Sequence, residues 1–221
     1  MSIEKNIFLS MKSILTMNDK IKRTVVLASG DFPRKGGRAF ALLLNAVRTV
    51  CCDSAANTYY RRFKKWPDVV IGDLDSFNCP AKNPPKCIVR DENDEINDLE
   101  KAINYCRKNL WDDLVIVGAT GKREDHTLGN IFRALALNVE IVTDYGRFYP
   151  VEGEAWLPSK NGAGVSIFAP ERGTRITSKN LQWPLDSVKF GNLFCATLNR
   201  ATASKIFLNS TKPVMVFVEG I

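Results

Sequence analysis

The feature that most constrains this fold is a regular alternation of short apolar runs with segments of helical periodicity over residues 23–147. The apolar runs are rich in β-branched residues, which favour buried strands. The segments between them repeat apolar side chains every three or four residues, as one face of a helix does. Strands that alternate with helices build a parallel sheet covered on both faces. We therefore predict a Rossmann-like α/β parallel-sheet domain.

The expected elements follow one another in chain order. Strands are predicted at residues 23–29, 49–52, 68–71, 87–90, 114–118 and 139–143. Helices are predicted at residues 38–47, 54–63, 97–110 and 128–135. The third helix begins at Asn97, which together with Glu100 resembles a capping box. The proline-rich connection at 79–86 is incompatible with a regular helix.

After about Arg147 the helical periodicity ends, and short apolar runs lie between turns. Strands are predicted at residues 165–168, 174–177, 189–196, 206–208 and 214–218. This pattern predicts a small all-β sandwich domain over residues 148–221. So small a unit buries little core, so we expect it to pack on the first domain, on a second copy of itself, or on both. Residues 1–22 are expected to be a loosely attached extension, with Met11 or Met17 as alternative starts.

Two acidic residues follow the apolar run Val69–Ile71 directly after Gly72. At a separation of about 5 Å and an effective dielectric of about 20, the carboxylates of Asp73 and Asp75 would repel by roughly 3 kcal/mol. Water at a surface turn would screen that repulsion, and a bound cation would offset it. Hard oxygen ligands suit Mg²⁺.

Ligands of such sheets bind beyond the carboxyl ends of the strands. The charged residues that follow a predicted strand or begin the next helix are Asp31, Asp53, Asp73, Asp75, Asp98, Arg123 and Asp125. For Asp98, simple helix-start chemistry is an alternative explanation. The shared placement of these residues predicts a site for a metal ion and phosphate.

The segment 119–126 joins a predicted strand to the next helix and contains Gly121, Lys122 and Arg123. Backbone donors, cations and a helix N-terminus are suited to phosphate oxygens. His126 is the single histidine of the chain, and it is either a hydrogen-bonded structural residue or part of this site.

The chain carries a formal net charge of +7, which suits either nucleic acid or a polyphosphate substrate. Its most basic segment is 61–65, which a solvated helix end would also explain. The six cysteines form no Cys-x-x-Cys pair, so we expect reduced thiols and a cytoplasmic location. No apolar run reaches the length of a membrane span, so we expect no membrane partner.

Several of these segments, in this order and spacing, resemble motifs of the thiamine pyrophosphokinase (thiamine diphosphokinase) family. Gly72-Asp73-Leu74-Asp75-Ser76 resembles Gly-Asp-x-Asp-Ser, and Asn97-Asp98-Leu99-Glu100-Lys101-Ala102 resembles Thr-Asp-x-x-Lys-Ala. The segment 121–128 is similar to Gly-Gly-Arg-x-Asp-His-x-Leu, and 52–57 to Ala-Asp-Gly-Gly-Ala-Asn. In the β domain, 166–170 and 181–185 resemble strand motifs of the family.

The resemblance implies an enzyme that transfers pyrophosphate from ATP to the hydroxyl of thiamine and releases AMP. It implies that residues 23–147 form the catalytic, ATP-binding domain and that residues 148–221 bind thiamine and dimerise. It also implies a homodimer with the thiamine site near the interface. Mg²⁺ would be held by Asp73, Asp75 and Asp98, which with Arg123 form the catalytic set.

The resemblance further implies the substrate ligands. The residues expected to bind ATP are Asp53, Asn57, Asp73, Lys101, Gly121, Arg123, Asp125 and His126. Those expected to bind thiamine are Asp94, Asp98, Trp183 and Asn199, with Trp183 stacking on the substrate or packing in the core of the sandwich. Either Asp98 or Asp75 would accept the hydroxyl proton.

Four positions depart from the family pattern: Asn97 replaces threonine, Lys122 replaces glycine, Leu198 replaces serine, and Asp94 stands where glutamine or lysine is common. These departures affect the substrate contacts more than the catalytic acids. Two other functions are compatible with the charges. One is a different Mg²⁺-dependent enzyme acting on nucleotides, a nucleotidyltransferase or pyrophosphohydrolase. The other is a basic nucleic-acid-binding module, which would not explain the acidic residues near the strand ends.

Overall fold

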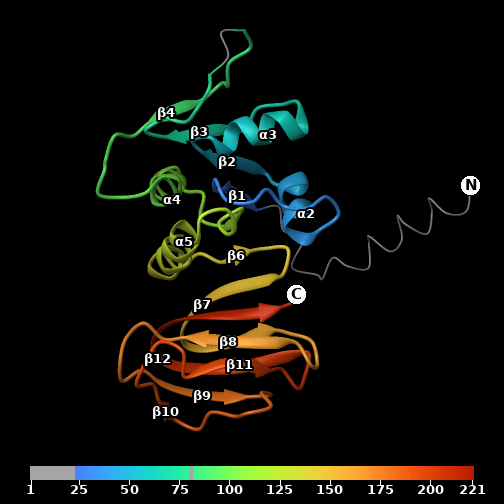
Figure 1. Ribbon diagram of the computed structural model, residues 1–221, viewed down its shortest axis with the longest axis vertical. Coiled ribbons are helices and arrows are strands. Elements are labelled where there is room, and N and C mark those ends of the chain that lie inside the picture. The colour runs from blue at the N-terminus through green and yellow to red at the C-terminus, as the bar shows by residue number, and fades with distance from the viewer. Residues whose placement is uncertain (1–22, 80–81) are drawn as a thin grey trace, which may run out of the picture.

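The computed structural model describes residues 23–79 and 82–221 and contains a 12-stranded sheet (Figure 1). Its first strands are β1 (Thr24–Leu27), β2 (Arg48–Cys52), β3 (Val69–Gly72), β4 (Ile88–Arg90), β5 (Leu114–Val117) and β6 (Ile141–Val142). The helices between them are α2 (Arg38–Asn45), α3 (Ala55–Phe63), α4 (Asp98–Lys108) and α5 (Glu124–Ala136). The expected extension at 1–22 lies outside the described residues.

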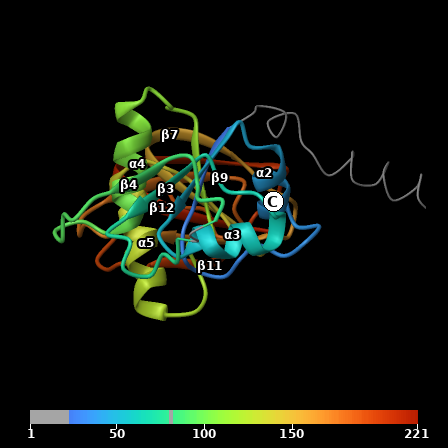
Figure 2. The same cartoon turned by 90° about the horizontal axis from the view of Figure 1, so that it is seen from above.

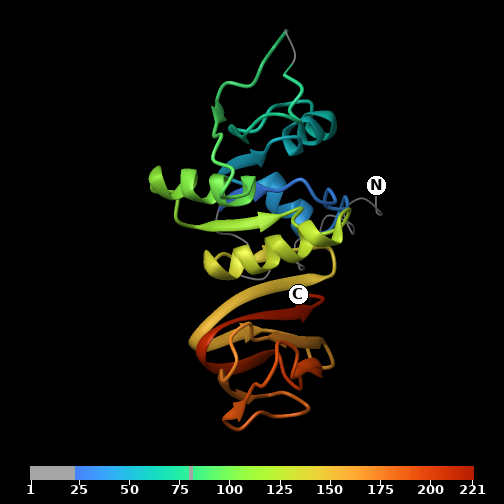
Figure 3. The ribbon, with the colours of Figure 1, turned by 60° about the vertical axis from the view of Figure 1, so that its left-hand side comes forward.

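The strands β1 to β6 pair in parallel, in the order β4-β3-β2-β1-β5-β6. Alternate residues of each strand enter separate cores. Val26 and Ile116 belong to the core that α4 and α5 cover, whereas Val25 and Val115 belong to the core under α2 and α3. Figures 2 and 3 show the two helix pairs on opposite faces of the sheet. The sequence prediction of a parallel sheet with helices on both faces describes this half of the sheet.

Helix α4 begins where the capping pattern predicted. The side chain of Asn97 accepts a hydrogen bond from the Glu100 backbone N–H at 3.0 Å. Glu100 itself pairs with Arg133 of α5 and so ties the two helices together on one face. The basic segment 61–65 lies at the C-terminus of α3, where the helix dipole favours cations.

In the second half of the chain, every helix or strand that the structure describes is a strand. They are β7 (Gly146–Pro158), β8 (Gly164–Phe168), β9 (Arg175–Lys179), β10 (Val188–Lys189), β11 (Ala196–Arg200) and β12 (Lys205–Glu219). β7 pairs with β6 in antiparallel orientation and with β12 along most of its length. The expected β sandwich is therefore not a separate sheet, because β7 continues the parallel sheet into a mixed one (Figure 1).

The long strand β12 changes partner along its length. The pairing of β12 with β7 shifts between Ser210 and Val214. The first part of β12 pairs with β9, and the last part pairs with β8, which in turn pairs with β11. A bridge between Leu181 and Ala201 joins the segments that follow β9 and β11. These pairings wrap the strands around one apolar core, whose largest fully buried side chain is Phe190.

The strand predictions for this half were wrong or incomplete at several places, and residues 206–208 and 214–218, expected as two strands, form the single strand β12. Residues 190–195 were expected to continue a strand, but the Asn192 side chain accepts a hydrogen bond from the Phe194 N–H at 3.1 Å and forms a local turn. β7 was not predicted, because Pro150 and Gly153 interrupt its alternation. Among the described residues, no helix combines the length and apolarity that crossing a bilayer requires.

Candidate active site

The acidic residues expected at the strand ends converge beyond β2 and β3. Asp53 follows β2, while Asp73 and Asp75 follow β3, and one carboxylate oxygen from each lies within 4.8 Å of the others. The turn after β3 is fixed locally, since Asp73 Oδ1 accepts a hydrogen bond from the Asp75 N–H at 3.1 Å. Ser76 Oγ donates to Asp75 Oδ1 at 2.8 Å. Parallel pairing of β2 with β3 thus brings three carboxylates to one point.

Asp53 carries the strongest indication that this point holds a cation. Its residue surface is 5% exposed, and within the described part of the chain its Oδ1 has no hydrogen-bond partner. Burial raises the pKa of the Asp53 carboxyl, and the nearby Asp98 carboxylate raises it further. A buried, unpartnered carboxylate oxygen beside two other carboxylates fits a hard divalent cation such as Mg²⁺.

Asp98 reaches the same cluster from the first turn of α4. Its Oδ1 lies 3.5 Å from Lys101 Nζ, and burial raises the pKa of the Asp98 carboxyl despite that lysine. The predicted ligand set joined Asp73 and Asp75 to Asp98, and the structure places Asp53 in the closest group with Asp98 beside it. Because β2 and β3 are neighbours, the position of Asp53 directly after β2 was the signal for this role.

Gly72 makes room for this arrangement. Its φ of +156° lies in a region that side chains rarely adopt. A Cβ added there would lie 3.1 Å from both the Asp53 Cβ and the Asp98 Oδ1. Gly72 therefore lets the backbone pass between two carboxylates that a larger residue would push apart.

A hollow of about 340 Å³ lies beside the acids, at the carboxyl ends of β1, β2 and β5. The charged or ring side chains that line it are Asp98, Lys122, Arg123 and His126. Lys122 Nζ donates to the Ser29 carbonyl at 2.7 Å, which holds it over the strand ends. Three of the residues expected to bind ATP, namely Gly121, Arg123 and His126, line this hollow.

Arg123 and Asp125 pair with each other at the start of α5. Arg123 Nη2 lies 2.6 Å from Asp125 Oδ2, and both side chains are exposed. Hydrogen bonding from Arg123 lowers the pKa of Asp125 to about 2. Asp125 therefore holds the guanidinium of a residue that lines the hollow.

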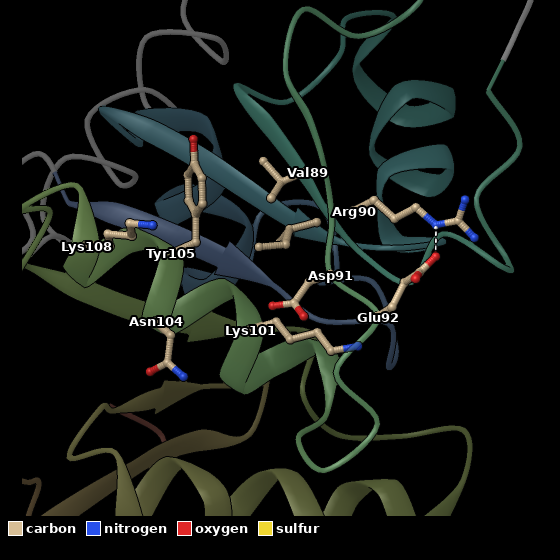
Figure 4. Close-up of a pocket in the computed structure, with 9 residues that line it drawn as sticks. Val89, Arg90, Asp91, Glu92, Lys101, Asn104, Tyr105 and Lys108 are labelled. Carbon is tan, nitrogen blue, oxygen red and sulfur yellow. Dashed lines mark ion pairs between the residues drawn. The ribbon is translucent and has the colours of Figure 1, made fainter.

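Two other residues expected to bind ATP, Asn57 and Lys101, do not line this hollow, although Lys101 Nζ still contacts the Asp98 carboxylate. The Asn57 amide bonds to both the N–H and the carbonyl of Asn78, so it anchors the segment after β3. Lys101 is 4% exposed and lines a different hollow, of about 640 Å³, between α4 and the β3–β4 edge. Figure 4 shows that hollow with Lys101 beside Asp91 and Glu92.

The residues expected to bind thiamine lie in two distant places. Asp94 is exposed in the segment before α4. Trp183 lies between β9 and β10 and is 54% exposed, so it is not a core residue. Asn199 is 4% exposed, and its amide bonds to the Trp183 main chain, with distances of 3.2 Å to N and 2.8 Å to O.

The sheet order separates Trp183 from the acids of its own chain. Five strand-to-strand steps lead from β3 to β7, and β9 and β10 lie beyond β7. At about 4.8 Å per step, the five steps alone amount to roughly 24 Å. Trp183 and the acidic cluster therefore do not face one another within one chain.

Comparisons with known proteins match both halves of the chain. The family model for the thiamin pyrophosphokinase catalytic domain matches residues 40–143, and the model for its substrate-binding domain matches residues 146–217. Thiamin pyrophosphokinase 1 of Caenorhabditis elegans is 24% identical over 230 residues, covering 95% of this chain and 94% of the relative. Thiamine pyrophosphokinase 1 of Oryza sativa subsp. japonica is 26% identical over 211 residues, covering 76% of each.

Solved structures share the fold. Thiamin pyrophosphokinase from Candida albicans superposes with a TM-score of 0.72 at 17% identity, covering 89% of both chains. Thiamine pyrophosphokinase from Bacillus subtilis gives a TM-score of 0.69 at 19% identity, covering 90% of this chain and 99% of the other.

Proposed function

This chain belongs to the thiamin pyrophosphokinase family, and we propose that its reaction centre is the carboxylate cluster of Asp53, Asp73, Asp75 and Asp98. The family reaction is the ATP-dependent pyrophosphorylation of thiamine, which gives thiamine diphosphate and AMP. The observation that carries the assignment to this cluster is the convergence of three acids, one of them buried with an unpartnered oxygen.

The cluster suits Mg²⁺ bound by Asp53, Asp73 and Asp75. The cation would neutralise charge on the phosphate oxygens as it develops. The buried Oδ1 of Asp53 supports this ligand set, since a buried charge without a partner is costly. Asp98 stands beside the three and also lines the neighbouring hollow, so we assign it the thiamine hydroxyl proton rather than Asp75.

The hollow beside the acids would hold the triphosphate. Lys122 and Arg123 both line it, and the planar fork of an arginine matches phosphate oxygens. The thiamine hydroxyl oxygen attacks the β-phosphorus and the bond from that phosphorus to the AMP oxygen breaks. Chemistry of this kind depends on positioning and on charge neutralisation. Asp125 would keep Arg123 oriented toward the leaving AMP.

We propose that thiamine is bound between two copies of the chain. Trp183 is exposed and rigidly held, and a flat indole ring suits the positive thiazolium of thiamine. Since Trp183 cannot reach the acids of its own chain, a second chain would supply them. Asp94 would then contact thiamine from the catalytic side, and Asn199 would act by holding Trp183.

The proposed function also gives a role to each half of the chain. Residues 23–147 would form the ATP-binding catalytic domain, and residues 148–221 the thiamine-binding and dimerisation domain, with β7 common to the sheet of both. All six cysteines are free, which supports a reducing, cytoplasmic setting.

The deciding experiment is incubation with ATP, Mg²⁺ and thiamine, followed by chromatographic separation of the products. We expect AMP and thiamine diphosphate in equal amounts. Release of pyrophosphate or orthophosphate without a diphosphorylated acceptor would instead indicate a nucleotidyltransferase or pyrophosphohydrolase. Salt-sensitive binding to DNA or RNA without turnover would indicate a nucleic-acid-binding module.

A further inference from the structure

The basic segment 61–65 belongs to a larger cationic surface that the proposed reaction does not use. This surface, here called the basic surface, consists of five exposed cations from α3, from the turn after it and from the segment between β3 and β4: Arg61, Lys64, Lys65, Lys82 and Lys86. Arg62 lies outside it, because its guanidinium covers the Phe32 ring at 5.6 Å. Residues 54–67 and 77–90 contain no aspartate or glutamate. Within the described chain, no ion pair joins a member of the basic surface to an acid, so its charge is open to an anionic ligand.

Tertiary contacts hold the two segments of the basic surface side by side. The Trp66 indole N–H, after α3, donates to the Asn83 carbonyl at 2.8 Å. The strands that follow the two segments, β3 and β4, pair in parallel with Val70 opposite Ile88, so both segments end at the same edge of the sheet. Figure 1 shows α3 and the segment between β3 and β4 together at the end of the molecule opposite β9 and β10. The cations of the two segments therefore form one surface.

An aromatic pair lies among these cations. The rings of Tyr60 and Trp66 stack with their centroids 4.2 Å apart and their planes at 20°, and both side chains are partly exposed. The Phe77 ring meets the Trp66 ring edge-on at 5.9 Å, which fixes the pair from the other segment. The Lys64 N–H donates to the Tyr60 carbonyl at 2.8 Å, so a cation directly adjoins the pair. Single-stranded nucleic acids bind to surfaces of this kind, where cations meet the phosphates and bases stack on aromatic rings.

The basic surface is separate from the acidic cluster. Helix α3 begins two residues after Asp53 and carries the chain away from the strand ends where the acids meet. At about 1.5 Å per residue, the nine residues of α3 put its last turn roughly 13 Å from its start. That distance exceeds the Debye length of about 8 Å at physiological ionic strength, so the acids do not cancel the charge of the basic surface. A ligand can therefore bind there while the reaction centre is occupied.

We propose that the basic surface binds single-stranded nucleic acid, with phosphates on its five cations and a base on the rings of Tyr60 and Trp66. This inference goes beyond the proposed function, because it uses no residue of the reaction centre. In a duplex the bases stack on one another, so a duplex would reach the cations but not the rings. A preference for single strands is therefore what distinguishes this surface from a merely cationic one.

The test follows the fluorescence anisotropy of a labelled oligo(U) RNA of about 12 nucleotides as the full chain is added at several salt concentrations. Each phosphate contact of a single strand contributes about −0.7 to the slope of log K against log salt, so five contacts give about −3.5. We expect Lys65→Ala combined with Lys86→Ala to bring the slope to about −2. Tyr60→Leu should weaken binding about tenfold and leave the slope unchanged, because it removes stacking but no charge. Lys212→Ala is the matched control, since Lys212 is a lysine of β12 that pairs with Glu171.

Three comparisons complete the test. An RNA duplex of the same length is expected to bind more weakly than the single strand, and saturating ATP with Mg²⁺ is expected to leave RNA binding unchanged. Oligo(dT) DNA of the same length distinguishes DNA from RNA as the ligand, and tight binding of either supports the proposal. The proposal is overturned if the duplex binds as tightly as the single strand, if ATP displaces the oligonucleotide, or if the paired lysine variant keeps the wild-type slope. Lys65 and Lys86 are both exposed, so that variant remains informative even where Tyr60→Leu lowers stability.

Discussion

The side chain of Asn199 forms two hydrogen bonds with the main chain of Trp183, accepting one from its N–H and donating one to its carbonyl. Asn199 Oδ1 also accepts from the Arg200 N–H at 2.8 Å, so the side-chain oxygen bonds to two backbone N–H groups. This leaves Trp183 exposed on a fixed support. In the proposed function Asn199 would position Trp183, and its loss is expected to act through that residue.

We expect Asn199→Ala to raise the KM for thiamine about tenfold while the KM for ATP stays within twofold, because only the tryptophan support is lost. Trp183→Ala should raise the thiamine KM by at least as much. Steady-state kinetics with each substrate varied in turn measure both effects. Equal increases in both KM values, with a lower melting temperature, would indicate a general structural role for these residues.

Asp73→Asn and Asp75→Asn are each expected to reduce turnover about a thousandfold or more, because the cation loses a charged ligand. The fold should persist, since both side chains lie at an open strand end. Circular dichroism and product formation measure the two properties. Glu92→Gln is the matched control, an exposed acid that pairs with Arg90 away from the cluster. Unchanged turnover in either aspartate variant would remove the metal assignment.

The buried carboxyl of Asp53 predicts a pH dependence of stability in metal-free protein. Its pKa is raised in the fold, so the native state binds this proton more tightly than the unfolded chain does. The stability contributed by this group is therefore greatest at low pH, falls as pH rises from about 4 through the folded pKa, and stays low above it. Mg²⁺ should reverse that loss.

Asp53→Asn tests this linkage while keeping a residue that tolerates a positive φ. At pH 7.5 in EDTA, we expect the variant to melt about 2–4 °C above the wild type, and to gain much less from added Mg²⁺. Differential scanning calorimetry at pH 5 and 7.5 provides the comparison. Equal stabilisation of the wild type and of Asp53→Asn by Mg²⁺ would contradict the prediction.

Gly72→Ala is expected to lower kcat by about 10–100-fold, because the added methyl group would press on Asp53 and Asp98 and displace the acids. Gly129→Ala is the matched control, since a Cβ there meets no atom within 4 Å. Kinetics at saturating substrate give kcat for both. Wild-type kcat in Gly72→Ala would show that the spacing of the acids is not critical.

Mixing two impaired variants, assayed at thiamine concentrations below the wild-type KM, tests whether the site is shared between chains. A heterodimer of Asp73→Asn and Trp183→Ala chains would keep one intact site, made from the acids of one chain and the tryptophan of the other. Random re-association after mild dissociation should therefore restore about a quarter of wild-type activity. Activity no higher than the average of the two parents would place both residues in the same chain's site.

The sequence was informative where a local pattern determines structure. Alternation of Val25 and Val26 between two cores, and the capping of α4 by Asn97, follow from side-chain period and backbone hydrogen bonding. The acids after β2 and β3 were expected together because parallel strands end at the same edge. Which three approach most closely depends on the turn geometry after Gly72, which spacing alone does not specify.

The second half was harder to predict because its strands are held by distant pairing. β12 changes neighbours along its length, its register with β7 shifts, and both strands contain a proline that interrupts the alternation of side chains. Asn192 and Asn199 are both asparagines near strand ends, but one forms a local turn and the other reaches a segment 16 residues away. The role of Asn199 depends on a tertiary contact that no short pattern records.

The continuous hydrogen-bonded ladder from β4 to β10 has a mechanical consequence. β7 pairs with β6 on one side and with β12 on the other, so paired backbone rather than a linker joins the two halves of the described chain. The distance between Trp183 and the acidic cluster of the same chain is therefore set when the sheet folds. In the proposed homodimer, this fixed distance would place Trp183 of one chain opposite the acids of the other before any substrate binds.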